Sequence, residues 1–372
     1  MMKKLRIILS FILLPLSILY GIVVFIRNKL YDYQWIPSRS FPIPLISVGN
    51  IAVGGTGKTP HIEYLAGLLK DEFTLAVLSR GYKRKRKGFQ MVTNSSSAEM
   101  VGDEPLQIKN KYPEIAVAVD GNRVRGINRL MDMIPDLDLV LLDDAYQHRK
   151  VKVNLSLLLM DYHHRASRDF LLPLGNLREP FYEKRRANMM LITKSPPDIQ
   201  PIERRIRLKK LKPYPYQQVF FTSLQYGSPR PVFKQESESS DERANIDMPD
   251  QDTTLLLVTG IANPKPLKKH IESNISEQVR PMRFPDHNYY SAGDIKKIRH
   301  RFTRIKGQKA IITTEKDAVR LRESVHLPAD LKQQMFYIPI RVTFVNSRTD
   351  DFNKQIIEYV RKNKQHSFLY PQ

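Results

Sequence analysis

The chain has 372 residues, which is long enough for two domains that each bury a core. It contains no cysteine, which excludes disulfide bonds and thiolate metal sites and suits a reducing compartment. Its 60 Lys and Arg residues against 38 Asp and Glu give a formal charge of +22. Such a charge favours nucleic acid, an anionic membrane or a phosphorylated substrate as partner, without choosing among them.

The first element expected in chain order is a membrane-associated helix over residues 1–30. Residues 7–26 carry no charged side chain, and about 20 apolar residues at about 1.5 Å each can cross a hydrocarbon core. The bulky end of this run argues against a cleaved secretory signal, which needs small residues at its cleavage site. Pro15 leaves open whether the helix spans the bilayer or lies in one leaflet. A buried core helix is the alternative, which the length and apolar composition disfavour.

Short apolar runs then alternate with segments long enough for helices, a pattern typical of a parallel sheet covered by helices. The runs are Leu45–Val48, Leu75–Leu78, Ala116–Val119, Leu139–Leu142, Leu155–Met160, Met189–Ile192, Leu255–Val258, Ala310–Thr313 and Phe336–Ile340. Residues 225–252 are rich in Ser, Pro, Glu, Asp and Gln and are interpreted as a linker. We therefore expect an α/β fold, with a larger P-loop domain over residues 38–224 and a smaller α/β domain over residues 253–366.

A glycine-rich stretch follows the first apolar run of this larger domain. It matches the phosphate-binding loop of P-loop NTPases, except that alanine replaces the first glycine. The expected nucleotide-binding residues are Ala52, Val53, Gly54, Gly55, Thr56, Gly57, Lys58 and Thr59. Glycines let backbone N–H groups approach phosphate oxygens, Lys58 adds charge at the outer phosphates, and the Thr59 hydroxyl can bind Mg²⁺. A preceding strand and a following helix that Pro60 opens favour a phosphate site over a structural turn.

Two acids, Asp143 and Asp144, end the apolar run 139–142. A carboxylate at a strand end near a P-loop holds Mg²⁺ against the nucleotide phosphates. Alone, the pair fits an acidic turn equally well, but together with the loop it favours metal binding. Arg80, Arg123 and Arg178 follow or lie near strand ends and are candidates for a phosphate clamp, with a solvated or ion-paired arginine as the alternative for each.

Six further motifs distinguish this chain among P-loop proteins. They are GDEP (102–105), DDAYQHRK (143–150), LLPLGNLREP (171–180), GIANP (260–264), FPDHNYY (284–290) and TTEKDAVR (313–320). In this order, after an apolar N-terminal helix, they resemble the tetraacyldisaccharide 4'-kinase family of lipid A biosynthesis over nearly the whole chain. That family phosphorylates the 4'-hydroxyl of an acylated glucosamine disaccharide 1-phosphate. One departure is Ala145, where the family usually has glycine after the paired acids, which removes a positive-φ option from the turn.

The resemblance implies an ATP- and Mg²⁺-dependent phosphotransferase with two α/β lobes, at the cytoplasmic face of the inner membrane. By motif position, Lys58 and Thr59 take the phosphate and Mg²⁺ roles. Asp143 and Asp144 take the acidic strand-end roles, and Glu179 falls where the family has an acid close to the metal. The expected catalytic residues are Lys58, Asp103 and His287.

In the family, the residues that match Asp103 and His287 act together at the catalytic centre. Phosphoryl transfer to an alcohol needs a base there, because the hydroxyl must lose its proton as it attacks phosphorus. The sequence leaves open which of the two accepts the proton. Without the resemblance, Asp103 also fits the start of a helix and His287 fits a structural histidine satisfied by backbone groups.

The expected partners are the acylated disaccharide lipid and the membrane surface, with no nucleic acid and no protein partner implied. A membrane-docked P-loop NTPase switch or chaperone is the alternative, which the missing guanine-selecting NKxD pattern weakens. A nucleic-acid-binding ATPase would account for the charge. The apolar N-terminus and the absence of a module that combines aromatic and basic residues argue against it.

Overall fold

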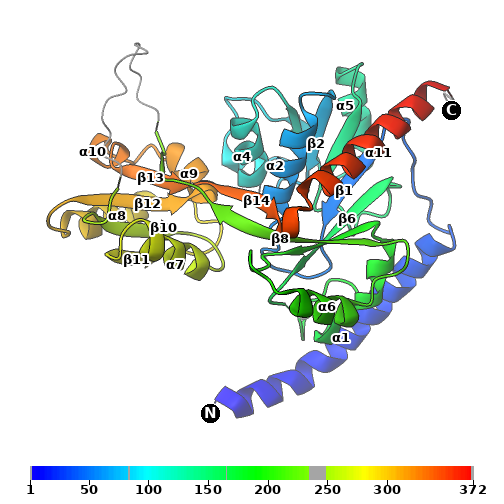
Figure 1. Ribbon diagram of the computed structural model, residues 1–372, viewed down its shortest axis with the longest axis horizontal. Coiled ribbons are helices and arrows are strands. Elements are labelled where there is room, and N and C mark those ends of the chain that lie inside the picture. The colour runs from blue at the N-terminus through cyan, green and yellow to red at the C-terminus, as the bar shows by residue number, and fades with distance from the viewer. Residues whose placement is uncertain (1, 83, 165, 234–248, 370–372) are drawn as a thin grey trace.

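The computed structural model describes residues 2–82, 84–164, 166–233 and 249–369, and it contains two sheets flanked by helices (Figure 1). Residues 234–248 of the expected linker lie outside the described residues. Within this described part, the larger sheet has nine strands in the order β14-β8-β7-β6-β1-β5-β2-β4-β3, and the smaller has five in the order β11-β10-β12-β13-β9. The expected α/β class is confirmed.

Seven neighbouring strands of the larger sheet, from β8 to β4, run parallel, and β14 and β3 pair antiparallel at its two edges. Four of the inner strands are buried at every residue because helices cover both faces, which explains their uninterrupted apolar sequences. The strands are β1 (Leu45–Gly49), β2 (Leu75–Ser79), β3 (Gln90–Met91), β4 (Ala116–Val119), β5 (Leu139–Asp143), β6 (Leu155–Asp161), β7 (Met189–Thr193), β8 (Gln218–Tyr226) and β14 (Ile340–Phe344).

Helices of the larger lobe cover its sheet, and four of them share one core cluster with the central strands. These are α2 (Lys58–Leu69), α3 (Ala98–Val101), α4 (Asp103–Lys111) and α11 (Thr349–Leu369). The other described helices of this lobe are α5 (Arg123–Met133), α6 (Pro201–Leu211) and the 3₁₀ segments η1 (Ala166–Arg168), η2 (Phe181–Arg186) and η3 (Val345–Ser347). Residues of α5 pack in a different cluster, with Leu45, Leu78 and Leu142.

The smaller lobe has its own sheet and its own core clusters. Its strands are β9 (Arg230–Pro231), β10 (Thr254–Thr259), β11 (Val279–Arg283), β12 (Lys309–Thr314) and β13 (Met335–Ile338). Its helices are α7 (Lys265–Asn274), α8 (Ala292–Thr303), α9 (Glu315–Arg322) and α10 (Ala329–Lys332).

The run Phe336–Ile340, expected as one strand of the smaller unit, is divided between the two sheets. It ends β13 in the smaller sheet and begins β14 in the larger one, with Pro339 between them. Nearby, the N–H of Gly227 donates to the carbonyl of Pro339 at 2.9 Å. The lobes are therefore joined where β8 leads toward β9 and β13 leads to β14, and α11 returns to the larger core through Phe352, Ile356 and Val360. Residues 253–366 thus contribute to both lobes.

The N-terminal helix α1 (Met2–Asp32) accommodates Pro15 within its 31 residues. Among the described helices, it alone is long and apolar enough to cross a membrane, over Ile12–Asp32. One side of it is fixed to the larger lobe, where the Ser17 hydroxyl donates to the carbonyl of Leu171 at 2.8 Å and the Tyr20 hydroxyl to that of Arg178 at 2.7 Å. Its other side is exposed and apolar.

Candidate active site

The phosphate-binding loop connects β1 to α2. Gly54 and Gly57 have φ angles of 113° and 87°, a region that only glycine adopts readily, which is why the loop requires glycine there. The loop is held at its start, where Val53 N donates to the carbonyl of Asn176 at 2.8 Å. Helix α2 begins at Lys58, so the N–H groups of its first turn border the loop. This arrangement suits an anion at the helix N-terminus.

The paired acids stand at the end of β5, beside the strand that leads into the loop. Lys58 Nζ lies 3.6 Å from a carboxylate oxygen of Asp144, and the guanidinium of Arg178 lies 3.1 Å from the other. The left-handed conformation of this turn falls on Asp144, whose φ is 48°. Ala145 is therefore compatible with the turn, because the positive φ is one residue earlier.

Asp143 is buried and has one carboxylate oxygen without a protein partner. Ser79 donates to Oδ2 at 2.9 Å, whereas Oδ1 has no hydrogen-bond partner among the described residues. Burial, together with the nearby charges of Glu104 and Asp144, raises the pKa of Asp143 to about 7. A divalent cation would supply the missing partner and the compensating charge, and carboxylate oxygen is a ligand that Mg²⁺ prefers. The residues present therefore fit the Mg²⁺ that the sequence predicts.

Among the described residues, no three acidic or histidine side chains form a ready metal site. Glu179, expected near the metal, is buried in an ion pair with Arg186 and accepts a hydrogen bond from Asn28 of α1 at 3.4 Å. Burial raises its pKa, and Arg186 opposes this. Glu179 thus connects Asn28 of α1 to Arg186 of η2.

The three candidate clamp arginines differ in their surroundings. Arg123 is buried and donates to the backbone carbonyls of Asp120 and Asp143, the latter at 2.9 Å. Arg178 faces Asp144, as described above, and Arg80 is exposed after the end of β2. The positive charges of Arg123 and Arg80 add to burial in lowering the pKa of His148 to about 4. Arg123 and Arg178 therefore contact the paired acids, whereas Arg80 lies close enough to Arg123 and His148 for its charge to act on them.

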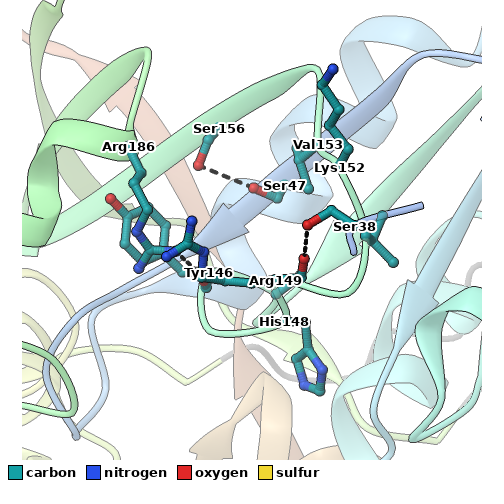
Figure 2. Close-up of a pocket in the computed structure, with 11 residues that line it drawn as sticks. Ser38, Ser47, Tyr146, His148, Arg149, Lys152, Val153, Ser156 and Arg186 are labelled. Carbon is teal, nitrogen blue, oxygen red and sulfur yellow. Dashed lines mark hydrogen bonds between the residues drawn. The ribbon is translucent and has the colours of Figure 1, made fainter. Parts of the chain in front are cut away.

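A polar cavity of about 210 Å³ lies next to the segment that follows the paired acids (Figure 2). Ser47 and Ser156 share a hydrogen bond of 3.2 Å within it. Its arginines are already paired, Arg149 with Asp32 of α1 at 2.8 Å and Arg186 with Glu179. These arginines are therefore structural, and their ion pairs connect α1 to the segment that follows β5.

Asp103 and His287 meet where the two lobes face each other. Asp103 begins α4 of the larger lobe, and His287 lies in the smaller lobe with Nδ1 3.3 Å from the Asp103 carboxylate. Burial opposes ionisation of Asp103, but the hydrogen bond from His287 and the charges of Lys316 and Arg320 outweigh it and lower its pKa to about 2. The pair expected from the sequence is therefore brought together, with an ionised carboxylate.

Lys316 and Arg320 are site residues to which the sequence analysis assigned no role. Arg320 forms an ion pair with Asp103, and its guanidinium lies 2.8 Å from His287 Nδ1. Lys316 Nζ lies 3.6 Å from Asp103 and 3.5 Å from Glu104. Their spacing of four residues in the motif TTEKDAVR places both on one face of α9, which was the available signal.

Helix α4 joins the two halves of the site. Its first residue meets His287 and Arg320, and the charge of its second residue, Glu104, acts on Asp143 at the end of β5. A phosphate-binding loop, a strand-end acid and an acid–histidine pair are thus arranged around one helix N-terminus. A parallel sheet with these parts defines a P-loop phosphotransferase.

The comparisons with known proteins identify its family. The family model described as tetraacyldisaccharide-1-P 4'-kinase matches residues 9–361, and the chain belongs to this family. A tetraacyldisaccharide 4'-kinase of Bacteroides thetaiotaomicron is 46% identical over 360 residues, 95% of this chain and 94% of that protein. The one of Flavobacterium johnsoniae is 43% identical over 353 residues, 95% of this chain and 97% of that protein.

A solved structure of the same family is also similar over nearly the whole chain. It is described as the apo form of LpxK from Aquifex aeolicus in complex with ATP, and it aligns with a TM-score of 0.72 at 29% identity. The alignment covers 95% of this chain and 99% of that one. The similarity therefore includes both lobes.

Proposed function

We propose that this protein transfers the γ-phosphate of ATP to the 4'-hydroxyl of an acylated glucosamine disaccharide 1-phosphate, at the cytoplasmic face of the inner membrane. The observation that carries the proposal is the meeting of Asp103 and His287 at the start of α4, whose Glu104 acts on Asp143 at the end of β5, in a chain of this family. A switch or chaperone would not need an acid–histidine pair across two lobes.

In this proposal residues 52–59 and the first turn of α2 hold the ATP phosphates. Lys58 provides charge at the outer phosphates. Thr59 and Asp143 hold Mg²⁺, which when bound neutralises charge on the phosphate oxygens. The unpartnered Oδ1 of Asp143 supports its role, and Asp144 keeps Lys58 and Arg178 oriented toward the loop.

We assign proton removal from the sugar hydroxyl to Asp103, with His287 as its partner. A carboxylate with a low pKa suits phosphoryl transfer, because the transition state is loose and the proton leaves late. His287 and Arg320 hold the carboxylate ionised at neutral pH and fix its orientation. The acceptor hydroxyl would approach Asp103 from the space between the lobes.

The lipid tails have a candidate position next to α1. An apolar cavity of about 560 Å³ lies between this helix and residues 166–181, lined by side chains that include Ile18, Phe25, Leu171 and Phe181. The same segment reaches the phosphate-binding loop, because Leu177 pairs with Ala52. Acyl chains in this cavity would therefore keep the sugar close to the bound nucleotide.

We also propose that the chain works as two lobes that both supply residues to the site. The larger lobe binds nucleotide through residues 38–224, the segment 225–252 links it to the smaller lobe, and residues from 253 onward supply His287, Lys316 and Arg320. The two cores, each with its own buried cluster, support this division.

A transfer assay tests the proposed function. Purified protein in detergent is incubated with Mg²⁺, ATP labelled in its γ-phosphate, and either the acylated disaccharide 1-phosphate or no acceptor. Label on the disaccharide is the expected result. ATP hydrolysis at the same rate with and without acceptor, and no labelled lipid, would overturn the proposal and favour the switch or chaperone.

A further inference from the structure

Helix α6 is the most basic exposed helix of the larger lobe. Its sequence, PIERRIRLKKL, has five cationic residues and one acid, and Leu211 is its only buried residue in the part of the chain that the structure describes. Two apolar side chains nevertheless face solvent, with Ile202 62% and Ile206 45% exposed. Single exposed apolar residues are ordinary, but apolar residues that adjoin on one face and are rimmed by polar groups mark an interaction surface.

These exposed residues form one stripe. At 3.6 residues per turn, Ile202 and Ile206 lie one above the other, with Arg205 and Lys209 along the same side. In the described part of the chain, neither Arg205 nor Lys209 makes an ion pair or a side-chain hydrogen bond, whereas the acid of the helix, Glu203, faces Tyr162 at 3.5 Å. The stripe of residues 202, 205, 206 and 209 therefore combines apolar contact with uncompensated positive charge.

Two aromatic side chains follow shortly after the helix. Tyr214 and Tyr216 stack with their ring centroids 5.7 Å apart, and Tyr216 is 59% exposed. Aromatic rings with a polar end are typical of the membrane–water boundary, where one side is apolar and the other is hydrated.

The segment that follows α6 is connected to the end of α1 through Arg185. The Tyr216 hydroxyl donates to the carbonyl of Arg185 at 2.6 Å, and the Arg185 guanidinium lies 2.5 Å from Asp32 at the end of α1. The inner face of α6 packs in the core cluster that contains Leu171, which also lines the cavity beside α1. Figure 1 shows α6 along the same side of the lobe as α1.

From this arrangement we propose that α6 is a second membrane contact, whose stripe docks on an anionic bilayer surface. The isoleucines enter the headgroup region, and Arg205 and Lys209 face lipid phosphates, where each cation contributes about 1 kcal/mol. With α1 as the first contact, α6 fixes the rotation of the larger lobe against the bilayer. The inference rests on the membrane association in the proposed function.

The absence of cysteine from the chain allows a direct test. The full-length variant Ile206→Cys, labelled with an environment-sensitive fluorophore, is reconstituted in vesicles of phosphatidylcholine alone or mixed equally with phosphatidylglycerol. Trp35, the only tryptophan, follows α1 and is 78% exposed, so its emission reports independently on the end of α1. A label on Lys296→Cys, exposed on α8 of the smaller lobe, is the matched control.

The label on α6 is expected to shift to the blue with the anionic mixture and not with phosphatidylcholine alone, while the label on α8 does not shift. In the labelled protein, adding Arg205→Gln and Lys209→Gln should lower the docked-to-free ratio of α6 by about 30-fold, equivalent to about 2 kcal/mol. The same two changes at Lys296 and Arg304, in the protein labelled at α6, should have no effect. Transfer of phosphate in detergent should be unchanged in all these variants.

Three results would overturn the inference. In the first, Trp35 shifts in anionic vesicles and the α6 label does not, which leaves membrane association intact but excludes α6. In the second, both labels shift equally, which indicates nonspecific adsorption. In the third, the α6 label shifts without vesicles as protein concentration rises, which assigns the stripe to a second copy of the chain. Failure of the unaltered chain to phosphorylate the lipid in detergent would instead count against the proposed function.

Discussion

At the scale of single residues, the proposed proton transfer depends on Asp103 being ionised and correctly oriented. Asp103→Asn keeps the shape but removes the proposed proton acceptor, so kcat should fall at least about 100-fold, the usual range for a general base. Lys58→Ala should cost at least as much because charge at the outer phosphates is lost. Initial rates with saturating Mg·ATP and lipid measure both effects. Near-normal turnover of the Asp103 variant would show that another group accepts the proton.

Asp143 predicts a pH dependence of metal binding. Its pKa is raised to about 7, so the side chain is protonated below that pH and ionised above it. Mg²⁺ needs the ionised form, and its affinity should therefore fall by up to about tenfold per pH unit below the pKa. The folding stability of the metal-free protein should change in the opposite direction. Because the pKa of Asp143 is raised in the folded state, its contribution to stability is lost as the pH rises through 7. Calorimetric titration of Mg²⁺ with a nonhydrolysable ATP analogue measures the affinity.

The matched control for this effect is Asp143→Asn, which has no ionisable group at the position. Its Mg²⁺ affinity should be weak and should no longer depend on pH between about 6 and 8, provided that Asp143 is the titrating group. An unchanged slope in this variant would assign the pH dependence to another residue.

At the scale of elements, one lysine joins three helices that carry the site. Lys111 at the end of α4 lies 2.5 Å from Glu63 of α2 and 3.8 Å from Glu315 of α9. Glu63 is buried and also accepts a hydrogen bond from Gln107 at 2.7 Å. Burial raises the pKa of Glu63 to about 7, against the charge of Lys111. This cluster fixes the helix of the phosphate-binding loop against the helices of Asp103 and Arg320.

Lys111→Met should therefore destabilise the protein by about 3 kcal/mol, because it leaves the buried carboxylate of Glu63 without a cation. Chemical denaturation followed by circular dichroism measures the loss. Adding Glu63→Gln to Lys111→Met should recover part of the stability, since the second change removes a buried charge. If Lys111→Met alone were as stable as the parent protein, the cluster would be solvated and would contribute little to stability.

At the scale of the whole molecule, α1 combines an exposed apolar side with a side that is bound to the larger lobe. Leu19→Asn with Val23→Asn changes only the exposed side, since these residues are 59% and 58% exposed. We expect this variant to lose membrane recovery and turnover of lipid in vesicles while keeping ATP affinity, because polar side chains oppose insertion. Fractionation and nucleotide binding measure the two properties.

Deletion of residues 1–29 is the contrasting variant. It also removes the hydrogen bond from Asn28 to Glu179 and the contacts of Ser17 and Tyr20 with residues 171–178. Stability should therefore fall as well as membrane recovery. Equal loss of ATP affinity in the double substitution and in the deletion would give α1 a folding role and not an anchoring one.

The sequence by itself determined the local features of this protein. Continuous apolar runs indicated strands buried on both faces, and the loop at residues 52–59 indicated a phosphate site, because each depends on neighbouring residues in one segment. The two acids at the end of β5 were found for the same reason. The resemblance added the roles of Asp103 and His287, which neither charge nor spacing could assign.

Only the tertiary structure decided what meets across long separations. Arg320 reaches Asp103 over 217 positions of the chain, and no local pattern encodes that distance. The division of residues 336–340 between two sheets and the return of α11 to the larger core follow from which apolar surfaces remain to be covered once each sheet has formed. Packing between distant segments thus set the geometry of the site, while the local sequence supplied its chemical groups.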